Sequence, residues 1–294
     1  MKYQLWCEVL EHRAVGPACF ELTLLAPPIA AAARPGQFVH LSCRAAGSYD
    51  PLLRRPLSIF AADGQRGTVS LLYRTEGRGT AWLAALPAGA RVDVLGPLGH
   101  GFDLAKAGAG RPALLVAGGM GVAPLHFLAC KLKNQPEPVE IIFFYGAGEK
   151  NQLLLLDRLS VLASELIIST DDGSLGQAGP VTEPLAAYLS GRPAGVIYSC
   201  GPRPMLAAVA ELATRYDLPC EVSLEEKMAC GVGACLGCAC RTYRVAGRTN
   251  TSGEAGEAEQ PPYSLVCTDG PVFDARVVFP PPEDRVARPG RVEK

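Results

Sequence analysis

Four cysteines in the last quarter of the chain have the spacing of iron–sulfur ligands. Three follow the pattern C-x4-C-x2-C and the fourth comes later in YSLVCTDG; they are Cys230, Cys235, Cys238 and Cys267. This spacing, with a distant fourth cysteine, is the plant-type ligand pattern of a [2Fe–2S] cluster. The loop between the first three contains four small residues, namely Gly231, Gly233, Ala234 and Gly237. Because small residues let backbone N–H groups approach the cluster sulfides, the segment predicts a [2Fe–2S] site.

Two other interpretations of these thiols remain open, a structural zinc site and inert cysteines. Zinc usually takes two paired C-x2-4-C knuckles, whereas the fourth cysteine here has no neighbouring cysteine to pair with. A Rieske-type cluster is disfavoured because it needs two histidines. The four histidines, His12, His40, His100 and His126, all lie far upstream. Cys240 is ambiguous: it is either a spare thiol beside the cluster or a ligand in place of Cys238.

Two stretches in the first hundred residues have the chemistry of a flavin site. RRPLSIF places Arg54, Arg55, Pro56, Leu57 and Ser58 at the edge of a predicted strand. A guanidinium binds pyrophosphate in a planar, bidentate way, and a hydroxyl can hydrogen-bond a flavin ring. LLYRTEGRGTAWLAAL then supplies Tyr73 and Arg74 at a strand end, followed by Gly77, Gly79 and Thr80 at the start of a helix.

A helix start of this kind favours phosphate, since its N–H groups are unpaired and its dipole is positive there. Either stretch alone is weak, because a barrel strand with an exposed arginine is an ordinary feature. Together they predict a flavin site.

Two glycine-containing turns predict a nicotinamide nucleotide site. VAGGMGVAPL places Gly118, Gly119 and Gly121 between a buried strand and a helix, and IYSCGPRPML places Cys200, Gly201 and Pro202 after another strand. Ligands of doubly wound sheets bind at the carboxyl ends of the strands, where both turns are expected. The motif is not the full G-x-G-x-x-G, so a tight turn without a ligand is the alternative.

The segment STDDGSLGQAGPV bears on the choice between NAD and NADP. It places Asp171 and Asp172 after a further predicted strand. Carboxylates there would repel a 2′-phosphate and accept a hydrogen bond from a ribose hydroxyl, which favours NAD. Solvated acids of a turn are an equally common explanation.

The composition suits a globular chain that has two or three domains. The chain has 294 residues, of which 48% are hydrophobic and 19% charged, and its net charge is −1. A near-neutral balance argues against a nucleic-acid partner and a polybasic membrane anchor. The N-terminus has no signal-peptide core, and the longest apolar stretch, 112–130, is interrupted by glycines and proline, as in a strand, turn and helix. We therefore expect a cytoplasmic protein.

Eleven cysteines are many for a chain in a reducing compartment, where disulfides rarely persist. Five are scattered singly, and we expect them to act as small buried hydrophobic residues. They are Cys7, Cys19, Cys43, Cys130 and Cys220.

The strands and helices that we expect to position these residues form a multidomain α and β architecture. Residues 1–103 contain short apolar segments between Gly, Pro and Asp turns, which predicts an antiparallel β-barrel or sandwich as the FAD domain. Residues 104–219 alternate strands with helices, which predicts an α/β doubly wound parallel sheet as the NAD domain. Residues 220–280 form a small C-terminal [2Fe–2S] domain. We expect the tail 281–294 and the polar stretch 246–262 to be mobile.

The order of the motifs RPLS, LYR-x-x-x-x-GT, GGMG-x-AP, CGP-x-x-M, MACGVGACLGC and VCTDGPVF resembles one family. It is similar to the electron-transfer subunits of NAD-dependent dihydroorotate dehydrogenase, within the ferredoxin–NADP reductase superfamily, over roughly residues 3 to 280. The resemblance implies cluster ligation by the four cysteines and FAD contacts from Arg55, Pro56, Leu57, Ser58, Leu72, Tyr73, Arg74, Gly79 and Thr80. The spacer between Cys238 and Cys267 is longer than the family's, which puts the loop geometry in question.

The resemblance also implies a partner, a dihydroorotate dehydrogenase catalytic subunit that contains FMN, in a heterotetramer with two copies of each chain. Nicotinamide exchanges hydride, a [2Fe–2S] centre takes single electrons, and FAD does both. The expected route therefore runs from the partner's FMN through the cluster and FAD to NAD+, oxidising dihydroorotate to orotate in pyrimidine biosynthesis. The alternatives are a reductase subunit serving ferredoxin, sulfide or an oxygenase, and, from a different class, a zinc-stabilised binding module.

Overall fold

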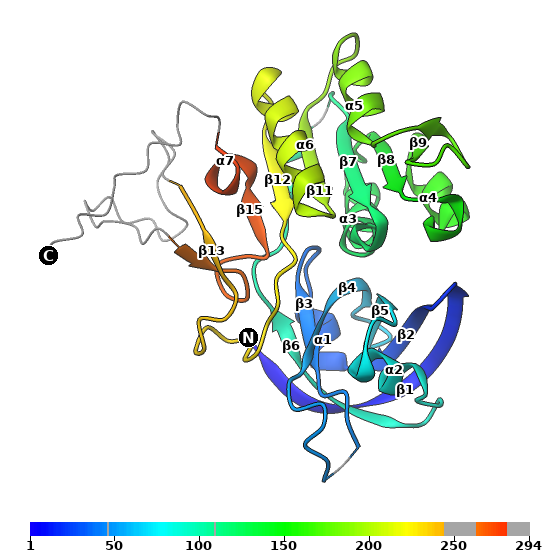
Figure 1. The fold of residues 1–294 in the computed structure, drawn as a ribbon, viewed down its shortest axis with the longest axis vertical. Coiled ribbons are helices and arrows are strands. Elements are labelled where there is room, and N and C mark those ends of the chain that lie inside the picture. Colours follow the sequence, from blue (N-terminus) through cyan, green and yellow to red (C-terminus); the bar gives the residue numbers. More distant parts are fainter. Residues whose placement is uncertain (46, 109, 244–262, 281–294) are drawn as a thin grey trace, which may run out of the picture.

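The computed structural model describes residues 1–45, 47–108, 110–243 and 263–280. In Figure 1 a barrel and an α/β domain lie one above the other, and the C-terminal segment lies beside both. The two segments for which we predicted mobility, 246–262 and 281–294, lie outside the described residues. Among the described residues, no helix combines the length and apolarity needed to cross a membrane.

The N-terminal domain is a closed six-stranded antiparallel barrel, so the barrel alternative is confirmed over the sandwich. The strand order is β1-β2-β5-β4-β3-β6. The bounds are β1 Tyr3–Gly16, β2 Cys19–Leu25, β3 Phe38–Leu41, β4 Arg55–Asp63, β5 Thr68–Arg74 and β6 Arg91–Leu98, with helices α1 Pro27–Ala32 and α2 Arg78–Ala84. Alternate residues such as Val39 and Leu41 point inward and are fully buried, which forms the barrel core.

The second domain contains a seven-stranded sheet in the order β10-β9-β8-β7-β11-β12-β15. The bounds are β7 Ala113–Gly118, β8 Ile141–Ala147, β9 Glu165–Thr170, β10 Gln177–Ala178, β11 Val196–Cys200, β12 Cys220–Ser223 and β15 Val272–Asp274. The strands are parallel, as predicted, except that β15 runs antiparallel to β12. The sheet therefore continues beyond residue 219, and the range 220–280 contributes two strands to it.

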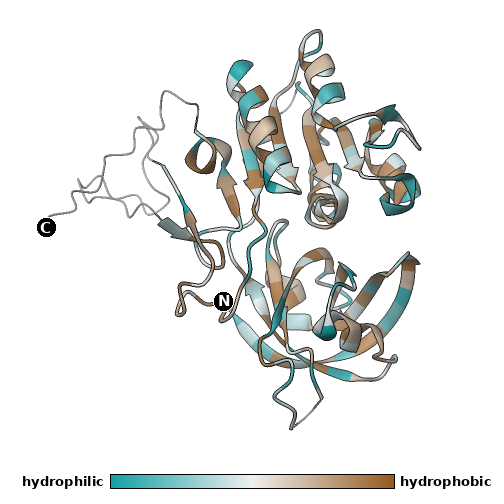
Figure 2. Ribbon diagram, in the orientation of Figure 1, coloured by the Kyte–Doolittle hydropathy of each residue, from teal (hydrophilic) through white to brown (hydrophobic). Residues whose placement is uncertain are grey.

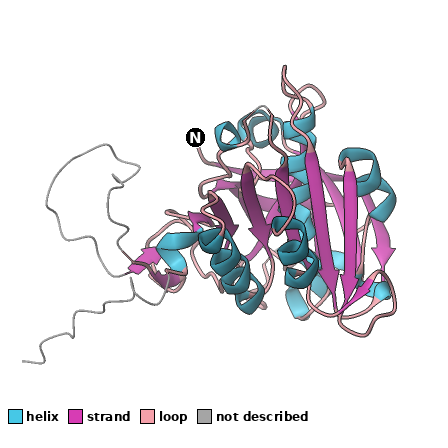
Figure 3. Ribbon diagram, turned by 90° about the horizontal axis from the view of Figure 1, so that it is seen from above, coloured by secondary structure: helices cyan, strands magenta, loops and turns pink. Residues whose placement is uncertain are grey.

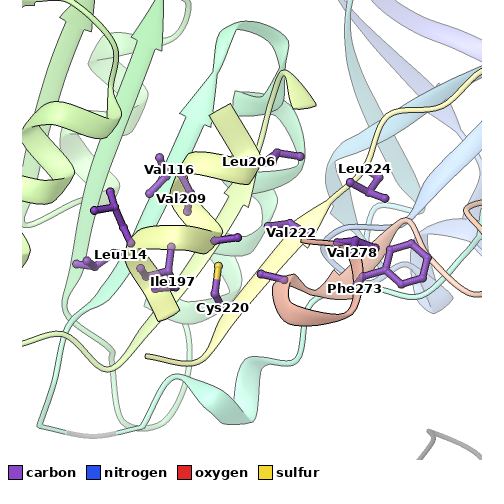
Figure 4. Close-up of a cluster of buried hydrophobic side chains, with 14 of the residues drawn as sticks. Leu114, Val116, Ile197, Leu206, Val209, Cys220, Val222, Leu224, Phe273 and Val278 are labelled. Atoms are coloured by element: carbon purple, nitrogen blue, oxygen red, sulfur yellow. The ribbon is translucent and has the colours of Figure 1, made fainter. Parts of the chain in front are cut away.

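Helices cover both faces of this sheet (Figure 3). They are α3 Val122–Lys133, α4 Leu156–Leu162, α5 Thr182–Leu189 and α6 Arg203–Arg215. Leu114 and Val116 of β7 pack with α5 and α6, whereas Leu115 and Ala117 pack with α3 and α4. Because both faces are buried, the strands are continuously apolar, and the central strands are largely brown in Figure 2. Figure 4 shows the α6 side of this core.

One predicted helix is shorter than its apolar pattern. The apolar pattern of residues 151–163 predicts a helix over this range, but α4 begins only at Leu156. Leu155 has a φ of 63° directly before it, and Leu153 and Leu154 are buried against the sheet rather than placed on a helix face. Tertiary burial therefore overrides the helical pattern in these first residues.

The cysteine segment connects two neighbouring strands of the sheet. It leaves β12, forms the small hairpin of β13 Ala239–Arg241 with β14 Tyr263–Leu265, and returns through β15 to α7 Ala275–Val278. The scattered cysteines are buried as predicted, except that Cys130 is only partly buried; the buried ones are Cys7, Cys19, Cys43 and Cys220.

Candidate cofactor sites

The predicted flavin strand β4 is accessible at its start and buried further along. Its first four residues are all partly exposed: Arg55, Pro56, Leu57 and Ser58. The next two, Ile59 and Phe60, are buried. The residues of this strand that the sequence assigned to FAD are therefore its partly exposed ones.

Arg54 directly precedes β4 and Arg55 is its first residue, and the two arginines have different partners. Arg54 pairs with Asp93, and its Nη1 donates to the carbonyls of Asp93 at 3.1 Å and His40 at 3.3 Å. None of the ion pairs among the described residues involves Arg55, whose Nη1 donates to the Leu53 carbonyl at 2.7 Å. Arg54 thus stabilises the barrel, and the charge of Arg55 is available to a phosphate.

The fold brings Arg55 next to the glycine turn that opens α2. A Cβ placed on Gly79 would lie 3.0 Å from Arg55 Nε and 3.3 Å from Cys43 Cβ. The Thr80 hydroxyl oxygen accepts the N–H groups of Glu76 at 3.0 Å and Gly77 at 3.1 Å, which holds the turn in place. Residues from two separate predicted flavin stretches therefore meet at one place.

The side chains of β5 assigned to FAD are mostly used inside the protein. Leu72 and Tyr73 are buried, whereas Arg74 at the end of the strand is partly exposed. The Tyr73 hydroxyl lies 2.9 Å from His12 Nε2, and burial raises the pKa of this tyrosine. Only the main chain of Leu72 and Tyr73 is therefore left to contact a flavin, while Arg74 can offer its side chain.

The two predicted nucleotide turns pack against each other at the carboxyl edge of the sheet. Gly118 ends β7, and a Cβ on it would lie 2.7 Å from Met205 Sδ and 2.8 Å from Pro202 Cδ. A Cβ on Gly121 would lie 2.0 Å from the Cys200 carbonyl oxygen. Gly119 has a φ of 52° and is partly exposed. The backbone of one turn thus approaches that of the other without side chains between them.

This edge is the topological switch point of the sheet. From β7 the chain continues to β8 and β9 on one side, and β11 then pairs with the other side of β7. A crevice for a ligand is expected at such a point. The Cys200 thiol is buried and its pKa is raised by burial, so this residue presents its main chain rather than its sulfur.

The acids predicted to select NAD are exposed on the turn after β9. Asp172 accepts the N–H of Ser174 at 2.9 Å, and its hydrogen bonds with Ser174 lower its pKa. This carboxylate is therefore engaged in its own turn, which is the alternative left open for it. Asp171 is also exposed.

The four predicted cluster cysteines come together as two neighbouring pairs. The N–H of Cys235 lies 3.4 Å from Cys230 Sγ, and the N–H of Cys267 lies 3.4 Å from Cys238 Sγ. Cys235 is exposed, Cys230 is partly buried, and the second pair is buried. A [2Fe–2S] cluster has two irons and four cysteine ligands, so two pairs of thiols suit its donor set.

Backbone N–H groups already surround these sulfurs. Val232 N–H lies 3.5 Å from Cys230 Sγ, and Gly237 N–H lies 3.5 Å from Cys235 Sγ. The N–H of Val232, followed by that of Cys235, lowers the pKa of Cys230 to about 6, whereas burial raises the pKa of Cys267 to about 12. The thiolate is the form that binds metal, and the loop favours it at Cys230.

Within the described ranges, no three His, Cys, Asp or Glu side chains are grouped as ligands of one metal ion would be. Cys240 is buried in β13, and burial raises the pKa of its thiol. Among the described residues, the four predicted ligands therefore lie in two pairs, and Cys240 is a buried residue of the neighbouring hairpin.

His40 is one residue of this region that the sequence motifs do not indicate. Its ring is fully buried on the barrel, and a Cβ on Gly231 would lie 2.6 Å from its Nδ1. Burial, followed by the charge of Arg54, lowers the pKa of His40 to about 4, so the ring is neutral. The alternation in GQFVHLSC, which puts His40 on the outer face of a strand, was the available signal.

Two family models match parts of this chain. Residues 225–279 match the family model "Iron-sulfur cluster binding domain of dihydroorotate dehydrogenase B", and residues 115–211 match "Oxidoreductase NAD-binding domain". The chain is 42% identical over 267 residues to the dihydroorotate dehydrogenase B (NAD+) electron transfer subunit of Geobacillus thermodenitrificans, covering 91% of this chain and 95% of that protein.

This chain belongs to the family of dihydroorotate dehydrogenase B electron transfer subunits. The subunit of Desulforamulus reducens is 38% identical, over 90% of this chain and 94% of that protein. Membership in the family confirms the predicted resemblance, and the iron–sulfur, FAD and NAD cofactors that we predicted are those of the family and of its structural neighbours.

Solved structures place the fold among the ferredoxin–NADP reductases. The structure of an NADH-dependent reduced ferredoxin–NADP oxidoreductase, described in connection with flavin-based electron bifurcation, has a TM-score of 0.76 and 26% identity, covering 93% of this chain and 90% of that one. The ferredoxin reductase in carbazole 1,9a-dioxygenase has a TM-score of 0.59 and 21% identity over 74% of this chain and 67% of that one. The predicted multidomain α and β fold is thus confirmed.

Proposed function

We propose that this chain is the electron transfer subunit of an NAD-dependent dihydroorotate dehydrogenase and carries electrons between a catalytic partner and NAD+. The observation that carries this function is the contact between the cluster loop and the flavin barrel. The loop that holds the paired thiols of Cys230 and Cys235 packs on the barrel at His40, on the strand next to β4. Family membership over nine-tenths of the chain supports the same function.

A different set of residues in the chain would hold each cofactor. Cys230, Cys235, Cys238 and Cys267 would bind the two irons. Arg55 and the Gly79 turn would bind the FAD pyrophosphate, with Ser58 beside the flavin ring. The turns at Gly118 and Cys200 would receive the nicotinamide nucleotide. When bound, these groups supply hydride exchange at the nicotinamide, single-electron exchange at the cluster, and both at FAD.

The proposed partner is a catalytic subunit that contains FMN and oxidises dihydroorotate to orotate, in an assembly with two copies of each chain. The names of the relatives support it, since they are called electron transfer subunits of dihydroorotate dehydrogenase B. The cytoplasm, where thiols stay reduced, suits a chain with eleven free cysteines.

Reconstitution with such a partner tests the function. We expect dihydroorotate to reduce NAD+ only when both subunits are present, and we expect ferredoxin, sulfide and an oxygenase to give far lower rates with the same preparation. Faster electron exchange with ferredoxin than with the partner would instead favour the ferredoxin reductase alternative, which the structural neighbour at a TM-score of 0.76 makes worth measuring.

The preparation itself provides a control. Before any turnover assay, we expect two irons and two acid-labile sulfides per chain, together with a flavin absorption band. Zinc in place of iron and sulfide would refute the proposed function without reference to the partner.

A further inference from the structure

His40 is a buried polar side chain without a hydrogen-bond partner. It lies on β3, whose Val39 and Leu41 point into the barrel, so His40 points outward. Its exposed fraction is 0%, and neither Nδ1 nor Nε2 makes a hydrogen bond among the described residues. An unpaired buried polar group is costly, and an apolar residue of similar size would avoid the cost.

The imidazole faces the start of the cluster loop. A Cβ on Gly231 would lie 2.6 Å from His40 Nδ1 and 3.2 Å from its Cε1, so the loop backbone passes directly over the ring. Gly231 has a φ of 71°, which a side chain rarely adopts, and it follows Cys230 directly. The loop can therefore come this close only because residue 231 is glycine.

The other side of His40 touches the predicted flavin strand. In the pairing of β3 with β4, His40 is opposite Pro56, and its carbonyl accepts a hydrogen bond from Arg54 Nη1 at 3.3 Å. The His40 side chain thus lies between Arg54, directly before the flavin strand β4, and the cluster loop that begins at Cys230.

We propose that His40 is a positioning residue that holds the Cys230 end of the cluster loop against the flavin barrel, donating a hydrogen bond to that loop when the cluster is bound. This role rests on the proposed function, because the His40 ring gains its hydrogen-bond partner only when the cluster is bound. An imidazole ring has an N–H group that it can donate to such a partner.

Two substitutions separate the polar role from simple packing. His40→Leu keeps most of the volume and removes both nitrogens, whereas His40→Gln keeps a donor. We expect His40→Leu to release the cluster to a chelator about tenfold faster than the unchanged protein, equivalent to about 1.4 kcal/mol. The same variant without cluster should melt at the same or a higher temperature, because an unpaired polar group has been removed. His40→Gln should release the cluster within about threefold of the unchanged protein.

His126→Leu is the matched control. His126 is also a buried histidine, but its Nδ1 lies 3.3 Å from the Phe60 carbonyl and its ring stacks on Phe60 at 4.1 Å, away from the cluster loop. We expect it to lower the melting temperature and to leave cluster release unchanged. The measurements are the decay of the visible iron–sulfur absorption under chelator, the electron paramagnetic resonance spectrum of the reduced cluster, and thermal melting.

The outcomes are distinguishable. Cluster release from His40→Leu at the rate of the unchanged protein, or equal acceleration by His126→Leu, would overturn the role of His40 and leave the proposed function standing. Absence of iron and sulfide from the unchanged protein would overturn both. Neither experiment needs the catalytic partner, so failure of reconstitution alone leaves the role of His40 intact.

Discussion

Gly121→Ala is the most severe single-methyl test of the nucleotide edge. Its φ of −59° suits alanine, so the effect of the substitution is steric. The new Cβ would lie 2.0 Å from the Cys200 carbonyl oxygen, 2.4 Å from its carbon and 2.8 Å from the Gly201 nitrogen. All three atoms are backbone, and ordinary contact begins at 3.4 Å, so a whole turn has to move.

The size of the effect follows from what resists the movement. β7 and β11 are paired from Val196↔Ala113 to Cys200↔Ala117, so the two turns cannot separate without disturbing the end of this ladder. Overpacking of a rigid site costs about 1–3 kcal/mol, and a contact between two backbones belongs at the upper end, about 3 kcal/mol. This predicts a melting temperature lower by roughly 6 °C or more.

The assay compares Gly121→Ala with Gly119→Ala. A Cβ on Gly119 meets nothing within 4 Å, so only its φ of 52° opposes alanine, at a cost of about 1–2 kcal/mol. We expect Gly121→Ala to melt at the lower temperature and to raise the NADH concentration needed for half-maximal flavin reduction at least tenfold. Equal melting temperatures and unchanged NADH dependence for Gly121→Ala would refute the close approach of the two turns as the basis of the site.

Four further substitutions test individual assignments. Cys235→Ser should keep FAD, because Cys235 is on the exposed loop, and should abolish partner-coupled turnover; the flavin content and the coupled rate measure this, and an unchanged rate would contradict the route through the cluster. Cys240→Ser should retain full iron and sulfide, since Cys240 is buried in β13, and loss of either would make it a ligand. Arg55→Gln should weaken FAD binding at least tenfold, because a charged hydrogen bond contributes about 1.5–3 kcal/mol. Arg54→Gln, which breaks the pair with Asp93, should mainly lower the melting temperature, and the reverse pattern would exchange their roles.

Local patterns were sufficient for the parts of the fold in which period and burial agree. The short apolar segments between Gly, Pro and Asp turns predict the barrel, and the continuous apolar run of β7 predicts a strand covered on both faces. Local patterns failed at 151–155, where the apolar residues pack against the sheet instead of continuing a helix.

The sheet's extension beyond residue 219 had no local signal. β12 has four residues and β15 has three, too short for a period to be recognised, and they pair across the whole cysteine segment. The sequence likewise assigned Tyr73 to the flavin from its motif, whereas the long-range contact with His12 decides where its side chain goes. The spacing of the cysteines predicted that they are cluster ligands, whereas tertiary packing determines which residues from elsewhere in the chain lie beside them.

The cluster segment is tied to the α/β domain at both ends, since it starts after β12 and returns through β15 beside the same strand. Leu224 N–H donates to the Pro271 carbonyl at 2.9 Å, and His100 N–H, in the link between barrel and sheet, donates to the Gly270 carbonyl at 2.5 Å. Main-chain bonds therefore fix the segment relative to the sheet. Its Cys230 end meets the barrel through the ring of His40. Because side-chain contacts can change while the main-chain anchors stay, substitution at His40 can alter the relation between cluster and flavin without moving the nucleotide site.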